Sequence, residues 1–333
     1  MHRAFALILL ALAAALTPGT ARASSVFSTE VVLAAELSER EGLTGEATGS
    51  QRSAVGFEWF GTAGGDRGDV VRFDLQVRVS HDAEEPGRTG PGLEIHNAWL
   101  DYRLSLGRTV RLGHFSPAFG LEPDVDTHGT LLQTQAGPDL GFKKDWGVAW
   151  MSLLGPGDLT VALQTGSGAA LDRRDRSRLA SARFTFPGGP NTTIGLAALS
   201  GRTLAAPGAR TLPLPDFAPE AVERSRAGMD ILRDAGNTRA FAELSVGEDD
   251  GEGRASLLAR VERTPVSLPR LRVAAQARFG KSGGDAFSAL SAGVEYRLSD
   301  FWSASAALVR DDPATGPHDL RLQFLLYRFR RHS

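Results

Sequence analysis

Apolar and polar residues alternate along most of the chain after about Ser24, in segments of about ten residues, and almost no window holds the period of a helix. In the segment 69–80, every second residue from Val71 to Val79 is apolar, and charged or amide side chains stand between them. Successive side chains of a strand point to opposite faces. The pattern therefore predicts strands with one apolar and one polar face.

About sixteen such segments follow one another to the end of the chain, and an even number is typical of single-chain bacterial outer-membrane barrels. They lie at residues 26–37, 52–61, 69–80, 93–104, 108–115, 145–154, 158–165, 177–187, 192–200, 224–233, 238–247, 253–263, 270–280, 286–298, 301–310 and 318–329.

Short and longer connections tend to alternate between these segments. The short ones lie at 61–68, 105–107, 155–157, 188–191, 234–237, 264–269 and 299–300. The longer ones lie at 38–51, 81–92, 116–144, 166–176, 201–223, 248–252, 281–285 and 311–317, although 248–252 and 281–285 are themselves brief. Short periplasmic turns and longer extracellular loops are typical of outer-membrane barrels.

These observations predict an all-β fold, a transmembrane antiparallel β-barrel of about sixteen strands. A sheet that spans a membrane must close, because edge N–H and C=O groups have no partners in hydrocarbon. The apolar face then meets lipid and the polar face points inward. A barrel of this size is wide enough to hold water. A soluble β-sandwich fits less well, because many apolar-face positions are alanine rather than large core residues.

The first 23 residues predict a secretory signal peptide. A short basic start (His2 and Arg3) precedes an apolar run from Ala4 to Leu16, and Ala21-Arg22-Ala23 forms a small-x-small cleavage site. No later run approaches the length of a transmembrane helix. We therefore expect residues 24–333 to form one barrel domain, exported to the outer membrane of the cell.

Composition narrows the possible partners. The formal net charge is -2 and the basic residues are spread along the chain, which argues against nucleic-acid binding. The chain has no cysteine, so disulfides and thiol chemistry are excluded. The predicted partners are the lipid bilayer and lipopolysaccharide, together with small hydrophilic solutes or ions.

The stretch from Arg111 to Glu122, RLGHFSPAFGLE, runs from a predicted strand into a bend marked by proline and glycine. It resembles the signature of outer-membrane porins related to the phosphate-selective porin O and P family, through Gly113, Phe115, Phe119, Gly120, Leu121 and Glu122. The resemblance covers only about residues 97–146. It implies a water-filled channel, a third extracellular loop folded into the lumen at about 116–144, and a homotrimer.

The inward fold of loop 116–144 is also favoured by its apolar residues, such as Phe119 and Leu140, which are costly to leave in water. The acids Glu122, Asp124 and Asp126 and the bases Lys143 and Lys144 are then candidates for the pore constriction, because rings of charge select ions by sign and size. Family members specific for phosphate use clustered lysines. This chain has only three lysines, so phosphate specificity is not supported.

Further candidates lie on the inward face of the predicted wall. They are Arg72, Asp74, Arg103, Arg111, Arg272 and Arg278. Arginines slightly outnumber acids at the inward positions, which favours a weak preference for anions. For any single residue, an equally good interpretation is a paired interior charge that stiffens the barrel.

Other motifs are weak. Gly280-Lys281-Ser282 lacks the upstream glycine of a phosphate-binding loop, and the histidines show no metal-ligand spacing, so no cofactor or metal is predicted. The acids of 248–252 are a candidate for a divalent ion that bridges lipopolysaccharide phosphates, although a solvated loop is the simpler interpretation. His114 and Ser116 resemble half of a hydrolase dyad, but no third partner is evident.

Passive diffusion without catalysis is the leading functional hypothesis, and two alternatives stay open. In the first, the barrel is a sheath or docking platform for a periplasmic partner. In the second, which is less favoured, it is an outer-membrane hydrolase.

Overall fold

The computed structural model describes residues 22–40, 42–44, 46–47, 50–65, 68–80, 92–140, 142–169, 175–204, 221–313 and 316–332. The predicted signal peptide lies outside these residues except for Arg22 and Ala23, which already belong to the first strand. Most of the predicted loop 201–223 also lies outside them. Within the described residues, no helix is long and apolar enough to span a membrane.

Sixteen long strands form the wall. They are β1 (Arg22–Ser38), β5 (Ala54–Gly65), β6 (Gly68–Ser80), β7 (Gly92–Ser105), β8 (Arg108–Phe115), β9 (Asp145–Leu154), β10 (Gly157–Gln164), β11 (Arg178–Gly189), β12 (Thr192–Leu204), β13 (Ala221–Ala235), β14 (Thr238–Asp249), β15 (Glu252–Arg263), β16 (Leu271–Ser282), β17 (Asp285–Arg297), β18 (Trp302–Asp312) and β19 (Asp319–His332). The short strands β2 (Gly42–Thr44), β3 (Glu46–Ala47) and β4 (Gln51–Arg52) lie between β1 and β5, and the short helix α2 (Ala136–Leu140) lies between β8 and β9.

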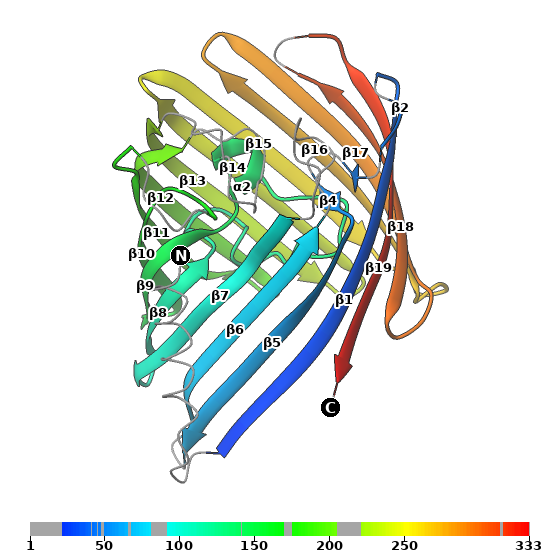
Figure 1. Ribbon diagram of the computed structural model, residues 1–333. Helices are drawn as coiled ribbons and strands as arrows, with labels where there is room; N and C mark the ends of the chain where they lie inside the picture. Colours follow the sequence, from blue (N-terminus) through cyan, green and yellow to red (C-terminus); the bar gives the residue numbers. More distant parts are fainter. Residues whose placement is uncertain are drawn as a thin grey trace.

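Each wall strand pairs antiparallel with the next, and the last strand returns to the first (Figure 1). The closing ladder between β1 and β19 runs from Phe27 opposite His332 to Ser38 opposite Arg321. Closure gives every strand a partner on both sides, as a sheet in hydrocarbon requires. The predicted barrel of about sixteen antiparallel strands is thus confirmed.

Strand positions follow the alternation closely. Residues 108–115 and 145–154 are strands with the predicted bounds. β14 and β15 extend beyond their predicted ends, so the predicted connection 248–252 shrinks to a tight turn at Asp250 and Gly251, which both have positive φ (48° and 82°). Two central residues with positive φ match the twist of a hairpin. The connection between β16 and β17 likewise shrinks, to residues 283–284.

The two faces of the wall carry opposite chemistry. Large apolar side chains such as Leu33, Leu244 and Val261 are 52%, 42% and 51% exposed on the outside. Charged side chains such as Glu30 and Arg78 are buried inside. A soluble protein buries its apolar face instead, so this arrangement fits a barrel whose outer surface meets lipid.

One rim of the barrel carries the connections at 106–107, 155–156, 190–191, 236–237, 264–270 and 298–301. We call it the turn rim; it is the lower rim in Figure 1. The opposite rim, which we call the loop rim, carries the connections at 39–53, 116–144, 165–177, 250–251, 283–284 and 313–318.

We expect a charge on the outer face to destabilise the barrel. Leu244 lies near the middle of β14, and the change Leu244→Arg should cost about 2 to 4 kcal/mol of folding free energy, because the guanidinium would face hydrocarbon. Ser305→Arg is the control, since Ser305 pairs with Glu295 on the inner face. Reversible unfolding in lipid vesicles measures the folding free energy of both variants. Equal losses for the two variants would contradict the assignment of faces.

Candidate functional site

The segment 116–144, between β8 and β9, leaves the wall through two glycines. Gly113 has a φ of 126°, and a Cβ there would overlap the backbone carbonyl of Ala98. Gly120 has a φ of 60° and passes close to the Glu243 carboxylate of β14. Only glycine tolerates such conformations and contacts easily. These residues therefore allow the chain to bend sharply from β8 and to approach strands on the other side of the barrel.

Near its start, the segment contacts β14 and β15. The backbone N–H of Leu121 donates to Glu243 Oε2 at 3.0 Å. Leu121 and Val125 pack against Phe241 and Leu258, and the Leu121 and Leu258 side chains are fully buried. Polar and apolar contacts together fix the segment to this part of the wall.

A second contact is with β1 and β19. Leu131 and Leu132 belong to a buried cluster with Val32 and Leu325, which come from the two strands that close the barrel. Gly129 lies so close to the Tyr327 ring that a Cβ would overlap it. The segment thus reaches strands at both ends of the chain.

His128 joins the segment to a buried ion pair of the wall. Arg78 of β6 donates to Glu30 of β1 through Nε at 2.8 Å and through a terminal nitrogen at 3.0 Å. The His128 ring bonds to the Glu30 carboxylate and lies within hydrogen-bond distance of Arg78 and Gln76. It also meets the His96 ring edge to face, with ring centres 5.4 Å apart.

The return path contacts β13 to β15. Arg260 donates to the backbone carbonyl of Gln133 at 2.8 Å, and Arg224 donates to that of Leu140 at 2.5 Å. Asp139, within α2, accepts a hydrogen bond from Ser245 at 2.8 Å and pairs with Arg226 at 3.5 Å. Charged wall residues therefore bind this return path through its backbone and through Asp139.

The predicted lysines end the segment. Lys143 donates to Thr127 Oγ1 at 3.1 Å and to the Gln133 side chain, so it bridges two parts of the segment. Lys144 donates to Asn97 Oδ1 of β7 at 2.5 Å. Burial lowers the pKa of both lysines from the usual value. Both ammonium groups are thus held in place rather than freely solvated.

The predicted acids of the segment lie in three different settings. Glu122 is buried and accepts a hydrogen bond from Thr134. Asp124 pairs with Arg183 of β11 at 2.7 Å, and Arg183 also pairs with Asp230 at the same distance. Asp126 is exposed and accepts the backbone N–H of His128 at 2.8 Å.

Three of the predicted wall arginines gather on β6, β7 and β8. Arg111 donates twice to Asp101, at 2.6 and 2.9 Å, and its guanidinium lies 4.0 Å from the centre of the Trp99 ring. Arg72 donates to the same carboxylate at 3.0 Å. Arg72, Asp101 and Arg103 line a cavity of about 280 Å³, together with Asp69, Val70 and Thr109. We call Arg72, Asp101, Arg103 and Arg111 the arginine cluster.

The remaining predicted wall residues, Arg272, Arg278 and Asp74, do not belong to this cluster. Arg272 of β16 pairs with Glu295 and, at 3.5 Å, with Glu262. Arg278, on the same strand, has a buried Nε without a hydrogen-bond partner among the described residues. Asp74 is 7% exposed on β6, and one of its carboxylate oxygens has no hydrogen-bond partner in the described part of the chain.

Sequence reasoning missed several contact residues. The candidates predicted from the sequence do not include Glu243, Glu30, Arg78 or His128. Their contacts depend on the path of the segment, which alternation does not encode. His114 and Ser116 do not form a dyad, because the His114 ring packs on Trp146 and no described hydroxyl hydrogen-bonds either of its nitrogens.

The described residues also contain no group of three His, Cys, Asp or Glu side chains arranged to hold a metal ion.

The fold and the inward charges define a class, the large outer-membrane barrels with a polar interior. No protein-family model and no curated protein matches this sequence. Several solved structures resemble it over nearly their whole length, among them the following three. An OmpT variant of Vibrio cholerae that lacks loop L8 has 10% identity and a TM-score of 0.64, covering 94% of this chain and 100% of that one.

The anion-selective porin from Comamonas acidovorans has 12% identity and a TM-score of 0.61, covering 93% of this chain and 100% of that one. The outer membrane channel DcaP of Acinetobacter baumannii has 12% identity and a TM-score of 0.61, covering 93% and 97%. At such identities the similarity shows the fold alone, and this chain has the fold of outer-membrane porins and channels. Membership of the porin O and P family stays a prediction.

We expect the segment 116–144 to loosen from the wall on acidification. Burial and the neighbouring Arg78 lower the pKa of His128 from its usual 6.5, whereas the opposing Glu30 and Asp126 raise it less. The undocked segment then binds the proton more tightly than the docked one. Docking is therefore strongest above about pH 6.5 and weakens below it, by at most about 1.4 kcal/mol per pH unit.

Hydrogen exchange of the segment between about pH 7.5 and 5.5 measures this effect. His128→Gln should remove the pH dependence, because Gln does not titrate in this range. His318→Gln should retain it, because His318 is exposed on the loop rim. A pH dependence that survives in His128→Gln would exclude His128 as its source.

Proposed function

We propose that the protein is an outer-membrane porin through which small hydrophilic solutes or ions cross by passive diffusion, without catalysis. The observation that carries this proposal is the closed sixteen-strand barrel with large apolar side chains outside and charged side chains inside. Such a surface suits a bilayer, and a barrel of this width encloses an aqueous interior. The shared fold with solved porins and channels supports the same function.

Segment 116–144 would act as the constriction of this channel. It contacts β1, β6, β7, β11, β13, β14, β15 and β19, which are distributed around the wall. Its charged residues Lys144 and Asp126 would lie beside the remaining passage. Solutes would then be selected by size at the segment and by charge at these side chains.

The arginine cluster would give the passage a weak preference for anions. Two guanidinium groups, those of Arg72 and Arg111, donate to one buried carboxylate, Asp101, beside a cavity that Arg103 and Asp69 also line. Most other inward arginines are paired, for example Arg183 with Asp230 and Arg78 with Glu30. The excess of positive charge would therefore lie at Arg72 and Arg111, which share one carboxylate, rather than be spread over the wall.

The predicted signal peptide, the location in the outer membrane and the contact with lipopolysaccharide belong to the same proposal. One of the similar solved structures is described as a trimer form of OmpT. A homotrimer is accordingly the assembly that we propose for this chain.

Conductance in planar bilayers tests the channel directly. Purified protein should show stepwise ion conductance, and replacing residues 127–138 by a short Gly-Ser linker should raise both the conductance and the size limit for sugars in liposome swelling. The physical reason is that the replacement removes His128, Leu131 and Leu132, which hold the segment across the interior. A folded barrel that never conducts would reject the porin proposal, and an unchanged size limit would reject the constriction.

Reversal potentials in a salt gradient test the sign of selectivity. Arg72→Gln should lower the anion preference, because it removes one positive charge while Arg111 still neutralises Asp101 through two hydrogen bonds. Arg328→Gln is the matched control, since Arg328 lies over Trp302 on the outer face. Cation preference in the unaltered protein would be incompatible with the proposed role of the cluster.

A further inference from the structure

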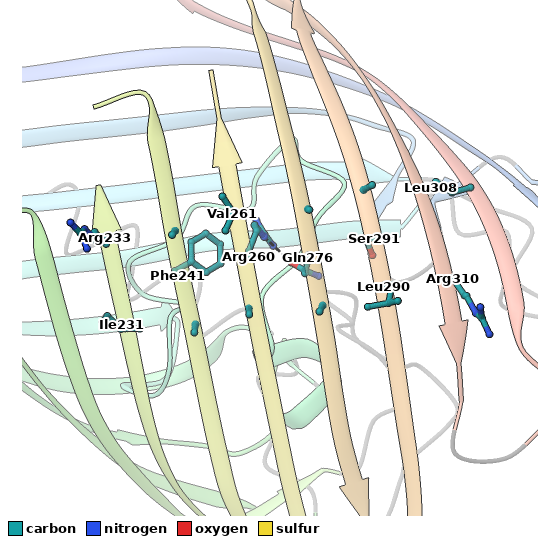
Figure 2. Close-up of a pocket in the computed structure, with 16 residues that line it drawn as sticks. Ile231, Arg233, Phe241, Arg260, Val261, Gln276, Leu290, Ser291, Leu308 and Arg310 are labelled. Atoms are coloured by element: carbon teal, nitrogen blue, oxygen red, sulfur yellow. Dashed lines mark hydrogen bonds between the residues drawn. The ribbon is translucent and has the colours of Figure 1, made fainter. Parts of the chain in front are cut away.

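A groove of about 740 Å³ crosses the outer face of the barrel over β13 to β18 (Figure 2). Its floor consists of six outward alanines, Ala240, Ala242, Ala259, Ala275, Ala277 and Ala292, and of Val261 among them. They belong to two neighbouring rows in which each residue is the ladder partner of the next. The groove therefore runs perpendicular to the strands, across six of them.

Larger side chains border this groove. On the side toward the loop rim, Met229, Leu244, Leu257 and Phe279 form one continuous row of ladder partners and are 41% to 51% exposed. On the other side lie Val273 and Val294, which are also ladder partners. Small residues between two rows of large ones make a channel on the surface rather than a flat patch.

The shape of the groove favours a flexible chain over a second barrel. Its two rows follow the convex wall across six strands, from Ile231 and Arg233 on β13 to Leu308 and Arg310 on β18. A second convex barrel would touch only a narrow band of this wall. A hydrocarbon chain is able to follow the curve, and the apolar alanine floor at the depth of the membrane suits it.

The ends of the groove differ in charge. Arg233 lies two residues before the end of β13 at the turn rim, is exposed, and makes no ion pair with a described residue. Arg263, at the end of β15, is a second exposed outward arginine on the same rim. At the opposite end, Arg310 is paired with Asp312 at 3.3 Å. Unneutralised positive charge is thus found at the turn rim, where it would attract a phosphate group.

We propose that this groove binds one anionic phospholipid of the periplasmic leaflet, with an acyl chain along the alanines and the headgroup phosphate at Arg233. The proposal rests on the outer-membrane location under "Proposed function", because the turn rim then faces the periplasm. It adds a specific lipid to the general bilayer contact. The lipid is recognised by its negative headgroup at one end and by the shape of the groove along its length.

Native mass spectrometry of the full chain in detergent tests the site, with phosphatidylglycerol and phosphatidylcholine added in separate titrations. The unaltered protein should retain one phosphatidylglycerol in preference to phosphatidylcholine. Ala259→Phe should abolish this retention, because the ring fills the groove. Ala227→Phe is the matched control, since Ala227 is an exposed outward alanine of β13 outside the groove, and it should retain the lipid.

Charge variants locate the headgroup. Arg233→Gln should weaken phosphatidylglycerol binding about fivefold, the effect of one basic residue near an anionic lipid. Arg310→Gln should leave it unchanged. The reverse result, or equal retention of lipid by Ala259→Phe and Ala227→Phe, would overturn the proposal. A change of oligomeric mass in Ala259→Phe alone would also overturn it, because the groove would then be a contact between copies.

Channel conductance separates this inference from the proposed function. Ala259 lies on the outer face, so Ala259→Phe should conduct like the unaltered protein. If the lipid fails to bind but conductance persists, only the lipid site is rejected. If no variant conducts, the porin proposal fails on its own measurement.

Discussion

The structure depends on one constraint, which is that no backbone hydrogen-bonding group of a membrane-spanning sheet is left without a partner. β1 and β19 satisfy it by pairing across twelve ladder positions, from Phe27 to Ser38. The closed sheet then has one convex and one concave face, and alternation assigns every second residue to each. Outward leucines and valines and inward arginines and acids follow from this single geometric fact.

The interior of the closed barrel contains many buried charged side chains, and their pairing strongly affects stability. Buried charges are costly unless they are paired and hydrogen-bonded. Here Glu30 and Arg78 neutralise each other, and His128 of the segment joins them. Glu243 instead accepts a backbone N–H from Leu121. The wall and the segment therefore depend on each other, because the groups of each complete hydrogen bonds of the other.

Much of the fold could be predicted from the sequence because strand alternation has an exact period and the faces differ strongly in polarity. β8 and β9 keep their predicted bounds for this reason. The ladder between β6 and β7 departs from this alternation. Its register shifts next to Gln76, which leaves His96 unpaired and brings both His96 and Asn97 into contact with the interior. A strict alternation places neighbours on opposite faces and does not reveal such a bulge.

The candidate site was predictable only in its residue types. Inward arginines and acids could be counted from the sequence, but their pairing could not, because partners such as Arg183 and Asp230 are 47 residues apart. A count of inward charges treats every arginine as free. The contacts show instead that many inward charges cancel locally, as Arg183 and Asp230 do, and that Arg72 and Arg111 share a single buried carboxylate. In the proposed channel, selectivity would therefore depend on which arginines remain incompletely neutralised, and not on how many the chain contains.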